Sequence, residues 1–446
     1  MRKHRTARAR ATRGALLGGA LALVAAAAPG PAAGAAADDS ETILVSVGLN
    51  GRPADGGSER ASVSADGNLV VFASHAGNLV RGDHNACTGI YLRDIARRTT
   101  VRVDRGRGGA PSDGCTGIDP IISSDGRYAV YSADATNLVR GVRDGRSHIY
   151  RTDLRTGETV LVSGIHGTPG DGDSMRPTLS ADGRRVAFAT SATNLVPGAP
   201  AGSWQTVVHD LRTGTLVRTS AADDGTPGNA ASDGTQISAD GRYVTFFSNA
   251  TNLVADDTNK KVDEFLHDTR TGRTTRLSVN AEGVQSDQIT IGGTVSDDNR
   301  YVVLNSHATN LTSDSPDTTQ DHAYLQDLRT GALRLMDKGA DGVPAPGGTF
   351  WASITGDGRH IPMASSGPAL VGGDTNKVRD IFVADLPSGD LRRVSVGSGG
   401  EEADAASYFP DADQHAATVV FTSYATNLVA RDDNDQPDIF LHRQKP

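Results

Sequence analysis

The amino-acid sequence predicts an all-β protein, a seven-bladed β-propeller of four-stranded antiparallel blades. Three observations lead to this fold class. Short strings recur about every 58 residues, the runs between them alternate apolar and polar residues as strands do, and the two ends of the chain each supply part of one repeat.

Three independent markers share the period of about 58 residues. The turn pair Asp-Gly, or once Asp-Asn, begins at Asp66, Asp125, Asp182, Asp240, Asp298 and Asp357. The string Ala-Thr-Asn-Leu begins at Ala135, Ala192, Ala250, Ala308 and Ala425. The Asp of segments such as "HDLRTG" stands at Asp94, Asp153, Asp210, Asp268, Asp327 and Asp385. Because a binding signature is expected where repeats differ, we interpret Ala-Thr-Asn-Leu as scaffold.

Each repeat contains four predicted strands, A to D. In the fourth repeat they are "TQIS" at 235–238, "RYVTFFS" at 242–248, "EFLHDTR" at 264–270 and "TTRLSV" at 274–279. The Asp-Gly pair between A and B predicts a tight hairpin turn whose two central residues both take positive φ. Four antiparallel strands per repeat are typical of a propeller blade.

The seventh repeat ends after its strand C, at "DIFLHRQKP" (438–446). The missing strand D is found near the other end of the chain, where "ETILVSVG" at 41–48 matches the D strands of other repeats. We therefore expect the N-terminal strand to complete the last blade, which leaves the ring without an open edge.

The unit "SADGRYVTF", followed by "DIFVADL" or "HDLRTG", resembles the TolB-type (PD40, WD40-like) propeller repeat. The resemblance covers residues 38–446 and implies the propeller fold, but it is weak for function. No α/β domain of the kind that precedes the propeller in TolB is seen, so a role in a Tol–Pal-like system is not implied.

Residues 1–37 have the pattern of a signal peptide: a basic start, a short apolar stretch and a small-residue cleavage site before Asp38. We expect an exported protein, secreted or periplasmic. Its single domain, 38–446, should be monomeric and not inserted in a membrane. Removal of the six basic residues of the signal takes the formal charge from -9 to about -15. An acidic domain argues against binding nucleic acid or anionic lipid.

The sequence contains two cysteines, Cys87 in the B–C loop of blade 1 and Cys115 in the loop that leads into blade 2. In a propeller these loops lie on the same face and next to each other. We predict a disulfide between them in an oxidising compartment, with free buried thiols as the alternative.

Three B–C loops carry spaced oxygen ligands that could hold structural Ca²⁺. They are Asp257, Asn259 and Asp263; Asp374, Asn376 and Asp380; and Asp432, Asn434 and Asp438. Asx turns and strand caps explain the same pattern without a metal, and that interpretation is preferred. We expect no cofactor.

Aromatic pairs mark two neighbouring blades of a chain with only 5% aromatic residues. Phe350 and Trp351 precede strand A of blade 6, and Tyr408 and Phe409 hold the equivalent place in blade 7. These rings predict a ligand platform at the channel mouth, which Trp204 of blade 3 could join from across the face. The alternative is that they plug a dry channel.

The sequence holds none of the common catalytic motifs. We therefore expect a non-catalytic propeller that binds a protein, peptide or envelope glycan through its long-loop face. A polysaccharide lyase or glycosidase that uses channel-mouth residues remains the alternative.

Overall fold

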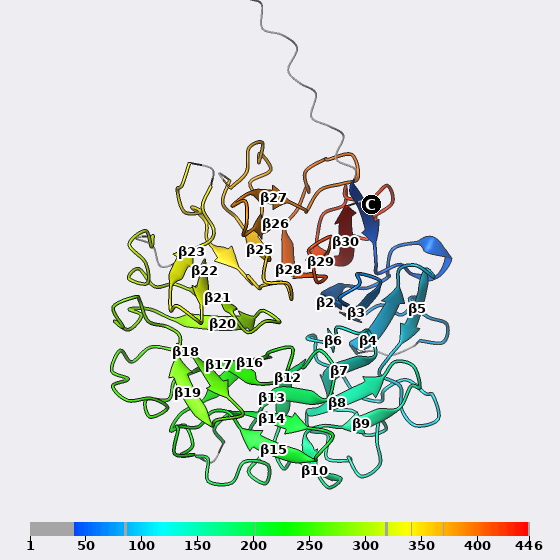
Figure 1. Ribbon diagram of the computed structural model, residues 1–446. Helices are drawn as coiled ribbons and strands as arrows, with labels where there is room; N and C mark the ends of the chain where they lie inside the picture. The colour runs from blue at the N-terminus through cyan, green and yellow to red at the C-terminus, as the bar shows by residue number, and fades with distance from the viewer. Residues whose placement is uncertain are drawn as a thin grey trace, which may run out of the picture. The chain divides into compact units, whose positions relative to one another are not determined.

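The computed structural model describes residues 40–83, 87–200, 202–316, 320–339, 341–368 and 370–444. They belong to one compact unit, residues 38–446. The predicted signal peptide, 1–37, lies outside the described residues. Seven four-stranded antiparallel sheets surround a central axis, as predicted (Figure 1).

The blades follow one another along the chain, and each begins with its innermost strand. Blades 1 to 3 consist of β2 (Ser58–Val63), β3 (Leu69–Ser74), β4 (Gly89–Asp94) and β5 (Thr99–Arg102); β6 (Ile121–Ile122), β7 (Tyr128–Ala133), β8 (His148–Asp153) and β9 (Thr159–Leu161); and β12 (Ser174–Leu179), β13 (Arg185–Thr190), β14 (Gln205–Asp210) and β15 (Thr215–Arg218). Blades 4 to 6 consist of β16 (Ser232–Ile237), β17 (Tyr243–Ser248), β18 (Asp263–Asp268) and β19 (Arg273–Arg276); β20 (Thr290–Val295), β21 (Tyr301–Ser306), β22 (His322–Asp327) and β23 (Leu333–Leu335); and β24 (Thr349–Phe350), β25 (His360–Ser365), β26 (Asp380–Asp385) and β27 (Leu391–Arg393). A short hairpin, β10 (Gly164–Ile165) with β11 (Thr168–Pro169), and the 3-10 helix η1 (Leu49–Gly51) lie in connecting loops.

Blade 7 joins the two ends of the chain, which confirms the predicted closure. It consists of β28 (Ser407–Ala412), β29 (Thr418–Ser423), β30 (Asp438–Gln444) and, outermost, β1 (Ser40–Leu44). Strand β1 pairs antiparallel with β30, from Ser40 opposite Gln444 to Leu44 opposite Phe440. Every blade therefore has four strands, and the ring has no unpaired blade.

The A–B turns differ from the predicted geometry. In blade 1, Gly67 takes φ +71° while Asp66 does not take positive φ. The Asp66 carboxylate accepts hydrogen bonds from the Ser64 hydroxyl (2.6 Å) and the Asn68 backbone N–H (3.1 Å). The turn is thus a longer Ser-x-Asp-Gly loop held by an Asx contact, in which only glycine needs positive φ.

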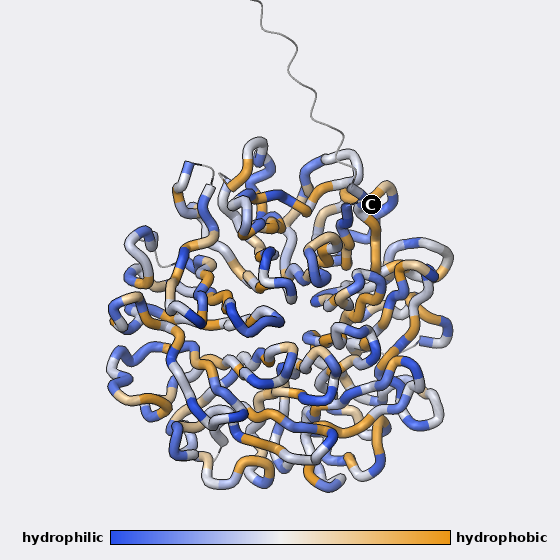
Figure 2. The backbone as a smooth tube through the Cα atoms, in the orientation of Figure 1, coloured by the Kyte–Doolittle hydropathy of each residue, from blue (hydrophilic) through white to orange (hydrophobic). Residues whose placement is uncertain are grey.

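The core consists of apolar layers between blades. Strands B and C carry facing aromatic rings, such as Phe72 stacked on Tyr91 and Phe246 stacked on Phe265, and all four rings are buried. Figure 2 shows apolar stretches in every blade around the ring. Repetition of one packing unit explains why the same residue types recur in the sequence.

The Ala-Thr-Asn-Leu loops are structural, as predicted. In blade 2, Asn137 Oδ1 accepts the Asp113 N–H and Asn137 Nδ2 donates to the Pro111 carbonyl. The Asp113 carboxylate accepts the Thr136 N–H and hydroxyl in return (both 2.7 Å). Leu138 is buried below this contact. The string therefore ties each B–C loop to the preceding D–A loop.

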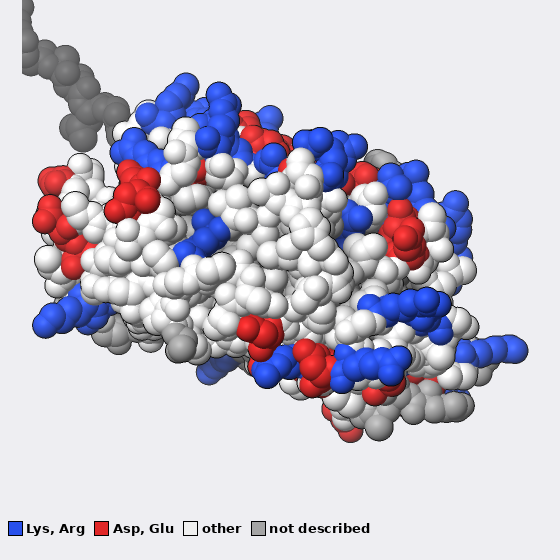
Figure 3. All heavy atoms as spheres, turned by 90° about the horizontal axis from the view of Figure 1, so that it is seen from below, with Lys and Arg blue, Asp and Glu red and all other residues white. Residues whose placement is uncertain are grey.

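The surface drawn in Figure 3 carries most of its Lys, Arg, Asp and Glu side chains along its margins, and the band between them is largely uncharged with isolated basic side chains. Among the described residues, no helix has the length and apolar character that a membrane crossing requires.

Candidate functional site

The inner strands of most blades carry a bulge at the long-loop end of the central channel. Pairing in β28 skips from Tyr408 to Asp411, and Phe409 in between takes φ +51°. Residues at the same place also take positive φ: Arg60, Arg176, Gly234, Gly292 and Trp351. Positive φ is costly for bulky side chains, and the bulge changes the direction in which its side chain points. The blades thus share this backbone conformation, but the type of residue that adopts it differs from blade to blade.

The two predicted aromatic pairs form one cluster. The Trp351 ring centroid lies 4.3 Å from that of Phe409, 5.7 Å from Phe350 and 5.9 Å from Tyr408. The exposed Tyr424 extends the cluster, with an edge contact to Tyr408 at 5.9 Å. Blades 6 and 7 therefore place their rings together, and Trp351 and Phe409 are only partly buried.

Two arginines lie on these rings. The Arg60 guanidinium lies 3.9 Å from the Phe409 ring centroid and forms a 2.8 Å ion pair with Asp119. The Arg379 guanidinium lies 4.3, 5.3 and 5.1 Å from the rings of Phe350, Trp351 and Tyr408. Within the described part of the chain, Arg379 forms no ion pair with a carboxylate. The cluster thus presents one uncompensated positive charge.

Two cavities of about 390 and 360 Å³ open along the channel. Their walls share Arg60, Asp119, Ile121, Gln236 and Trp351. A larger hollow of about 990 Å³ lies on the outside of blades 5 and 6, but no aromatic side chain is among its described lining residues. We favour the channel because it combines enclosure with the rings of Trp351 and Phe409, and because the Arg379 guanidinium lies on the Trp351 ring.

Carboxyl groups line the channel below the aromatic cluster. Asp411 accepts the Val63 N–H at 2.9 Å, and burial raises the pKa of Asp411 although this bond opposes the shift. Burial also raises the pKa of Asp297, against the hydrogen bond that Gln414 Nε2 donates at 3.1 Å. Both groups line the 390 Å³ cavity, where they could act as acids.

Trp204 stands apart from this cluster. It directly precedes β14 of blade 3, its backbone carbonyl accepts the Ser232 N–H at 2.9 Å, and it does not line either channel cavity. The structure therefore brings together four of the five predicted aromatic residues.

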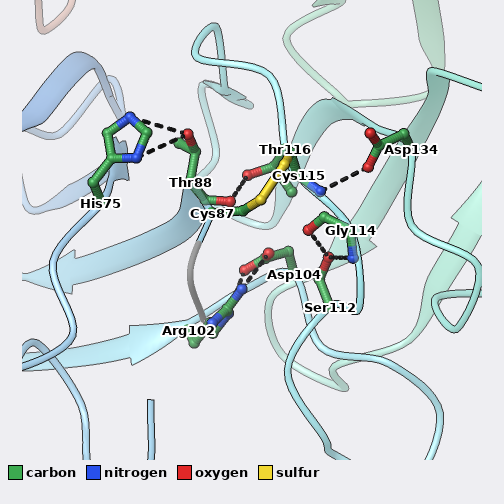
Figure 4. The surroundings of a disulfide bond; sticks show 10 residues. All are labelled: His75, Cys87, Thr88, Arg102, Asp104, Ser112, Gly114, Cys115, Thr116 and Asp134. Atoms are coloured by element: carbon green, nitrogen blue, oxygen red, sulfur yellow. Dashed lines mark hydrogen bonds and ion pairs between the residues drawn. A yellow bond between two sulfur atoms is a disulfide. The ribbon is translucent and has the colours of Figure 1, made fainter. Parts of the chain in front are cut away.

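Cys87 and Cys115 form a disulfide, as predicted, with Cα atoms 5.0 Å apart (Figure 4). The neighbouring residues add cross-loop bonds: the Thr116 hydroxyl donates to the Thr88 carbonyl at 2.7 Å, and the Cys115 N–H donates to Asp134 at 2.7 Å. The disulfide is consistent with export to an oxidising compartment.

The predicted calcium ligands have protein partners in blades 4 and 6. Asn259 Nδ2 donates to Asp263 (3.1 Å), and Asp257 lies 3.2 Å from Arg276. Asn376 Nδ2 donates to Asp380 (2.9 Å), and Asp374 lies 3.4 Å from Arg393. In blade 7, Asn434 Nδ2 donates to Asp438 (2.7 Å), but Asp432 forms no ion pair with any described residue. The three loops thus share the hydrogen bond from asparagine to aspartate, but only the loops of blades 4 and 6 have an arginine paired with their first aspartate.

Sequence reasoning missed the two arginines of the aromatic cluster. Arg379 is the residue before strand C of blade 6, where blades 4 and 7 have Val262 and Pro437. Arg60 holds the bulge position that Trp351 and Phe409 hold in their blades. Comparing every repeat position for charge, rather than for aromatic residues alone, would have found both.

No protein-family model matches the sequence, and no curated protein matches it. Solved structures similar to this chain include oligogalacturonate lyase from Vibrio parahaemolyticus, at 14% identity and a TM-score of 0.53 over 91% of this chain and 96% of that one. The β-propeller domain of the trilobed protease from Pyrococcus furiosus matches at 11% identity and 0.53, over 87% and 95%. A putative TolB from Agrobacterium tumefaciens matches at 18% and 0.41, over 66% and 87%. The first two matches show a shared propeller fold.

Proposed function

We propose that this chain is an exported, non-catalytic propeller that binds an acidic glycan at the mouth of its central channel. The observation that carries the proposal is Arg379, a guanidinium that lies on three aromatic rings without a carboxylate partner among the described residues. A planar cation beside aromatic faces suits a sugar ring that carries a carboxylate, because the sugar ring can stack on an aromatic face while its carboxylate pairs with the guanidinium.

The cavities support a ligand that enters the mouth from the long-loop face. Trp351 lines both cavities, and its ring contacts the Arg379 guanidinium, which is not itself a lining residue of either cavity. A ligand that lies against Trp351 and extends out of the cavity would therefore meet this charge. Arg60 is already paired with Asp119, and Arg176 with Asp233 at 2.8 Å. Among the described arginines at this mouth, Arg379 is therefore the one without a carboxylate partner.

The test is a binding titration with uronate oligosaccharides and with neutral oligosaccharides of equal length. The chain has two tryptophans, so Trp204→Phe leaves Trp351 as the only indole reporter of ligand. We expect acidic oligosaccharides to change its fluorescence, and Arg379→Gln to weaken their binding by about 10-fold to 100-fold, the usual value of a charge-assisted hydrogen bond. Trp351→Ala should weaken binding similarly when measured by calorimetry.

Trp204→Phe is also the matched control, because Trp204 lies outside the cluster and its loss should leave affinity unchanged. Equal binding of acidic and neutral sugars would contradict the role of Arg379. Binding of acidic peptides but not of glycans would contradict the ligand class.

A second function, glycan cleavage, is favoured by Asp297 and Asp411, whose pKa values are raised by burial in the channel wall. A carboxyl group whose pKa is raised keeps its proton to a higher pH than a free aspartic acid, which favours a role as a general acid. Incubation of the chain with acidic polysaccharides, followed by reducing-end and unsaturated-product assays, separates the two functions. Turnover that Asp297→Asn or Asp411→Asn abolishes would replace the binding proposal with an enzyme.

A further inference from the structure

Blades 4 and 6 neutralise a buried acidic pair in the same way. Each has one aspartate in the B–C loop and one at the start of strand C, and an arginine from strand D lies against the loop aspartate. Arg393 Nη1 pairs with Glu402 and also lies 3.4 Å from Asp374 Oδ1 and 3.9 Å from Asp380 Oδ2. In blade 4, Arg276 Nη1 lies 3.2 Å from Asp257 Oδ1. The guanidinium therefore has a defined place between the loop and the strand.

Blade 1 reaches the same balance with different residues. Arg102 forms ion pairs with Asp83 of the B–C loop (2.5 Å) and with Asp104 just after strand D (2.9 Å), and all three side chains are nearly fully buried. Three of the four blades with an acidic pair at this place thus put an arginine against it.

Blade 7 keeps the acids but not the arginine. The strand register identifies the equivalent residue: Arg276 lies opposite Phe265, Arg393 opposite Phe382, and in blade 7 Leu44 lies opposite Phe440. Leu44 belongs to β1, the N-terminal strand that closes the ring. An apolar side chain thus stands where the other two blades have a cation.

In blade 7, one carboxylate oxygen of the acidic pair has no hydrogen-bond donor among the described residues. Asp438 is fully buried and accepts bonds from Ser46 Oγ (2.5 Å) and Asn434 Nδ2 (2.7 Å). Asp432 is 9% exposed, and its buried Oδ1 has no hydrogen-bond partner among the described residues. Oδ1 is also the atom that meets the arginine in blades 4 and 6. A buried carboxylate without a counter-charge is costly.

We propose that a calcium ion occupies the place of the missing guanidinium in blade 7, bound by the carboxylates of Asp432 and Asp438. Two carboxylates suit a hard cation with oxygen ligands, and Ca²⁺ accepts irregular shells completed by carbonyl oxygens and water. The described residues contain no group of three or more His, Cys, Asp or Glu placed for a metal, so neutral oxygens must complete the shell. Because Asp438 is bonded to Ser46, just after β1, the ion would strengthen the closure of the ring.

Both carboxyl groups of this pair have raised pKa values in the metal-free chain. Burial, with the nearby charges of Asp438, Asp433 and Asp404, raises the pKa of Asp432 to about 7. Burial raises the pKa of Asp438 to about 6, against its bonds from Ser46 and Asn434.

The experiment measures thermal unfolding of the chelator-treated chain at pH 8 and constant ionic strength, with no added divalent ion, with millimolar Ca²⁺ or with millimolar Mg²⁺. We expect Ca²⁺ to raise Tm by about 3 °C and calorimetry to give one site. Leu44→Arg supplies the guanidinium, so it should raise Tm without calcium and remove the response to calcium.

Two further variants keep the result decisive. Asp432→Asn should remove the calcium response even if Leu44→Arg fails to fold. Asp374→Asn is the matched control, because blade 6 has its own Arg393, and it should keep the full response. The proposal is overturned if Ca²⁺ leaves the Tm of the unmodified chain unchanged, if the response survives in Asp432→Asn, or if Mg²⁺ alone produces it.

Discussion

Glu264 is a buried carboxyl group at a strand position that other blades fill with Ile90, Ile149, Ile381 and Ile439. Its Oε1 accepts the Gly293 N–H of the bulge in the next blade at 3.0 Å, and its Oε2 has no partner among the described residues. Burial raises the pKa of Glu264 well above its usual value, although the bonds from Gly293 and Gly292 oppose the shift. The folded protein therefore holds the proton on this carboxyl group to a higher pH than the unfolded chain does.

Replacing Glu264 by Gln should change the pH dependence of stability. The folded chain keeps the proton to a higher pH than the unfolded chain, so the stabilisation by Glu264 is complete below about pH 4.3 and is lost as pH rises toward the folded pKa. In that window the loss is about 1.4 kcal/mol per pH unit. Urea unfolding at pH 5 and pH 8 should show that the free energy of unfolding of Glu264→Gln increases relative to that of the unmodified chain as pH rises.

The exposed Glu158 provides the control for this experiment, since Glu158→Gln should leave the pH profile unchanged. A stability difference between Glu264→Gln and the unmodified chain that is the same at both pH values would contradict the buried neutral carboxyl.

At the residue scale, the sequence predicted the side chains that repeat and those that differ visibly from the repeat. Phe350, Trp351, Tyr408 and Phe409 were identified because aromatic residues are rare in this chain, and the structure brings them together. Glu264 could not be found in this way, because an acid in a chain rich in acids is conspicuous only once its burial is known. Leu44 is an ordinary strand residue until the register places it opposite Phe440.

At the scale of single elements, the disulfide joins two loops that hydrogen bonds alone hold in the other blades. It links the B–C loop of blade 1 to the D–A loop that enters blade 2, across 28 residues. Replacing both cysteines by Ser should lower the free energy of unfolding by about 3 kcal/mol, the value expected for a loop of this length. Denaturant unfolding of the double variant, beside the unmodified chain with and without reductant, measures the difference.

Reduction and double substitution should give the same stability if the bond alone matters. A double variant as stable as the oxidised chain would show that the bonds from the Thr116 hydroxyl and N–H to the Thr88 carbonyl hold this connection without the disulfide.

Predictions for elements succeeded where hydrophobic periodicity decides the structure and failed where a local hydrogen bond does. The strands were found because their inward residues alternate, as in Val244 and Phe246 of β17. The A–B turns were assigned the wrong geometry because the Ser64 hydroxyl and the Asp66 carboxylate bond each other, so positive φ is needed at Gly67 alone. The sequence analysis placed the aromatic pairs before strand A, whereas Phe350 lies in β24 and Tyr408 and Phe409 lie in β28. The bulge in the inner strand interrupts the alternation of apolar and polar residues, so periodicity did not reveal where the strand begins.

At the scale of the whole molecule, stability depends on the strand that joins the ends of the chain. Strand β1 forms the outer edge of blade 7 through five paired positions, and the Thr42 hydroxyl, the Ser46 hydroxyl and the Glu41 carboxylate contact residues several hundred positions away. Such contacts exist only when the ring is closed, so their loss is felt by blade 7 and by the loop that enters it from blade 6.

Removal of residues 38–48 should therefore destabilise every blade and not only the last one. Without β1, blade 7 loses its outer strand, β30 becomes an exposed edge, and the apolar contacts of Val45 in the layer between blades 1 and 7 are lost. We expect a single unfolding transition with Tm lower by on the order of 10 °C, followed by calorimetry. A synthetic peptide of residues 38–48, added in excess, should raise Tm again, because it can pair with β30 as β1 does. A peptide with the same composition in scrambled order should not. If the shortened chain melts at the temperature of the longer one, or melts in two steps with six blades unaffected, then the ring is held by contacts between neighbouring blades and not by the pairing of its ends.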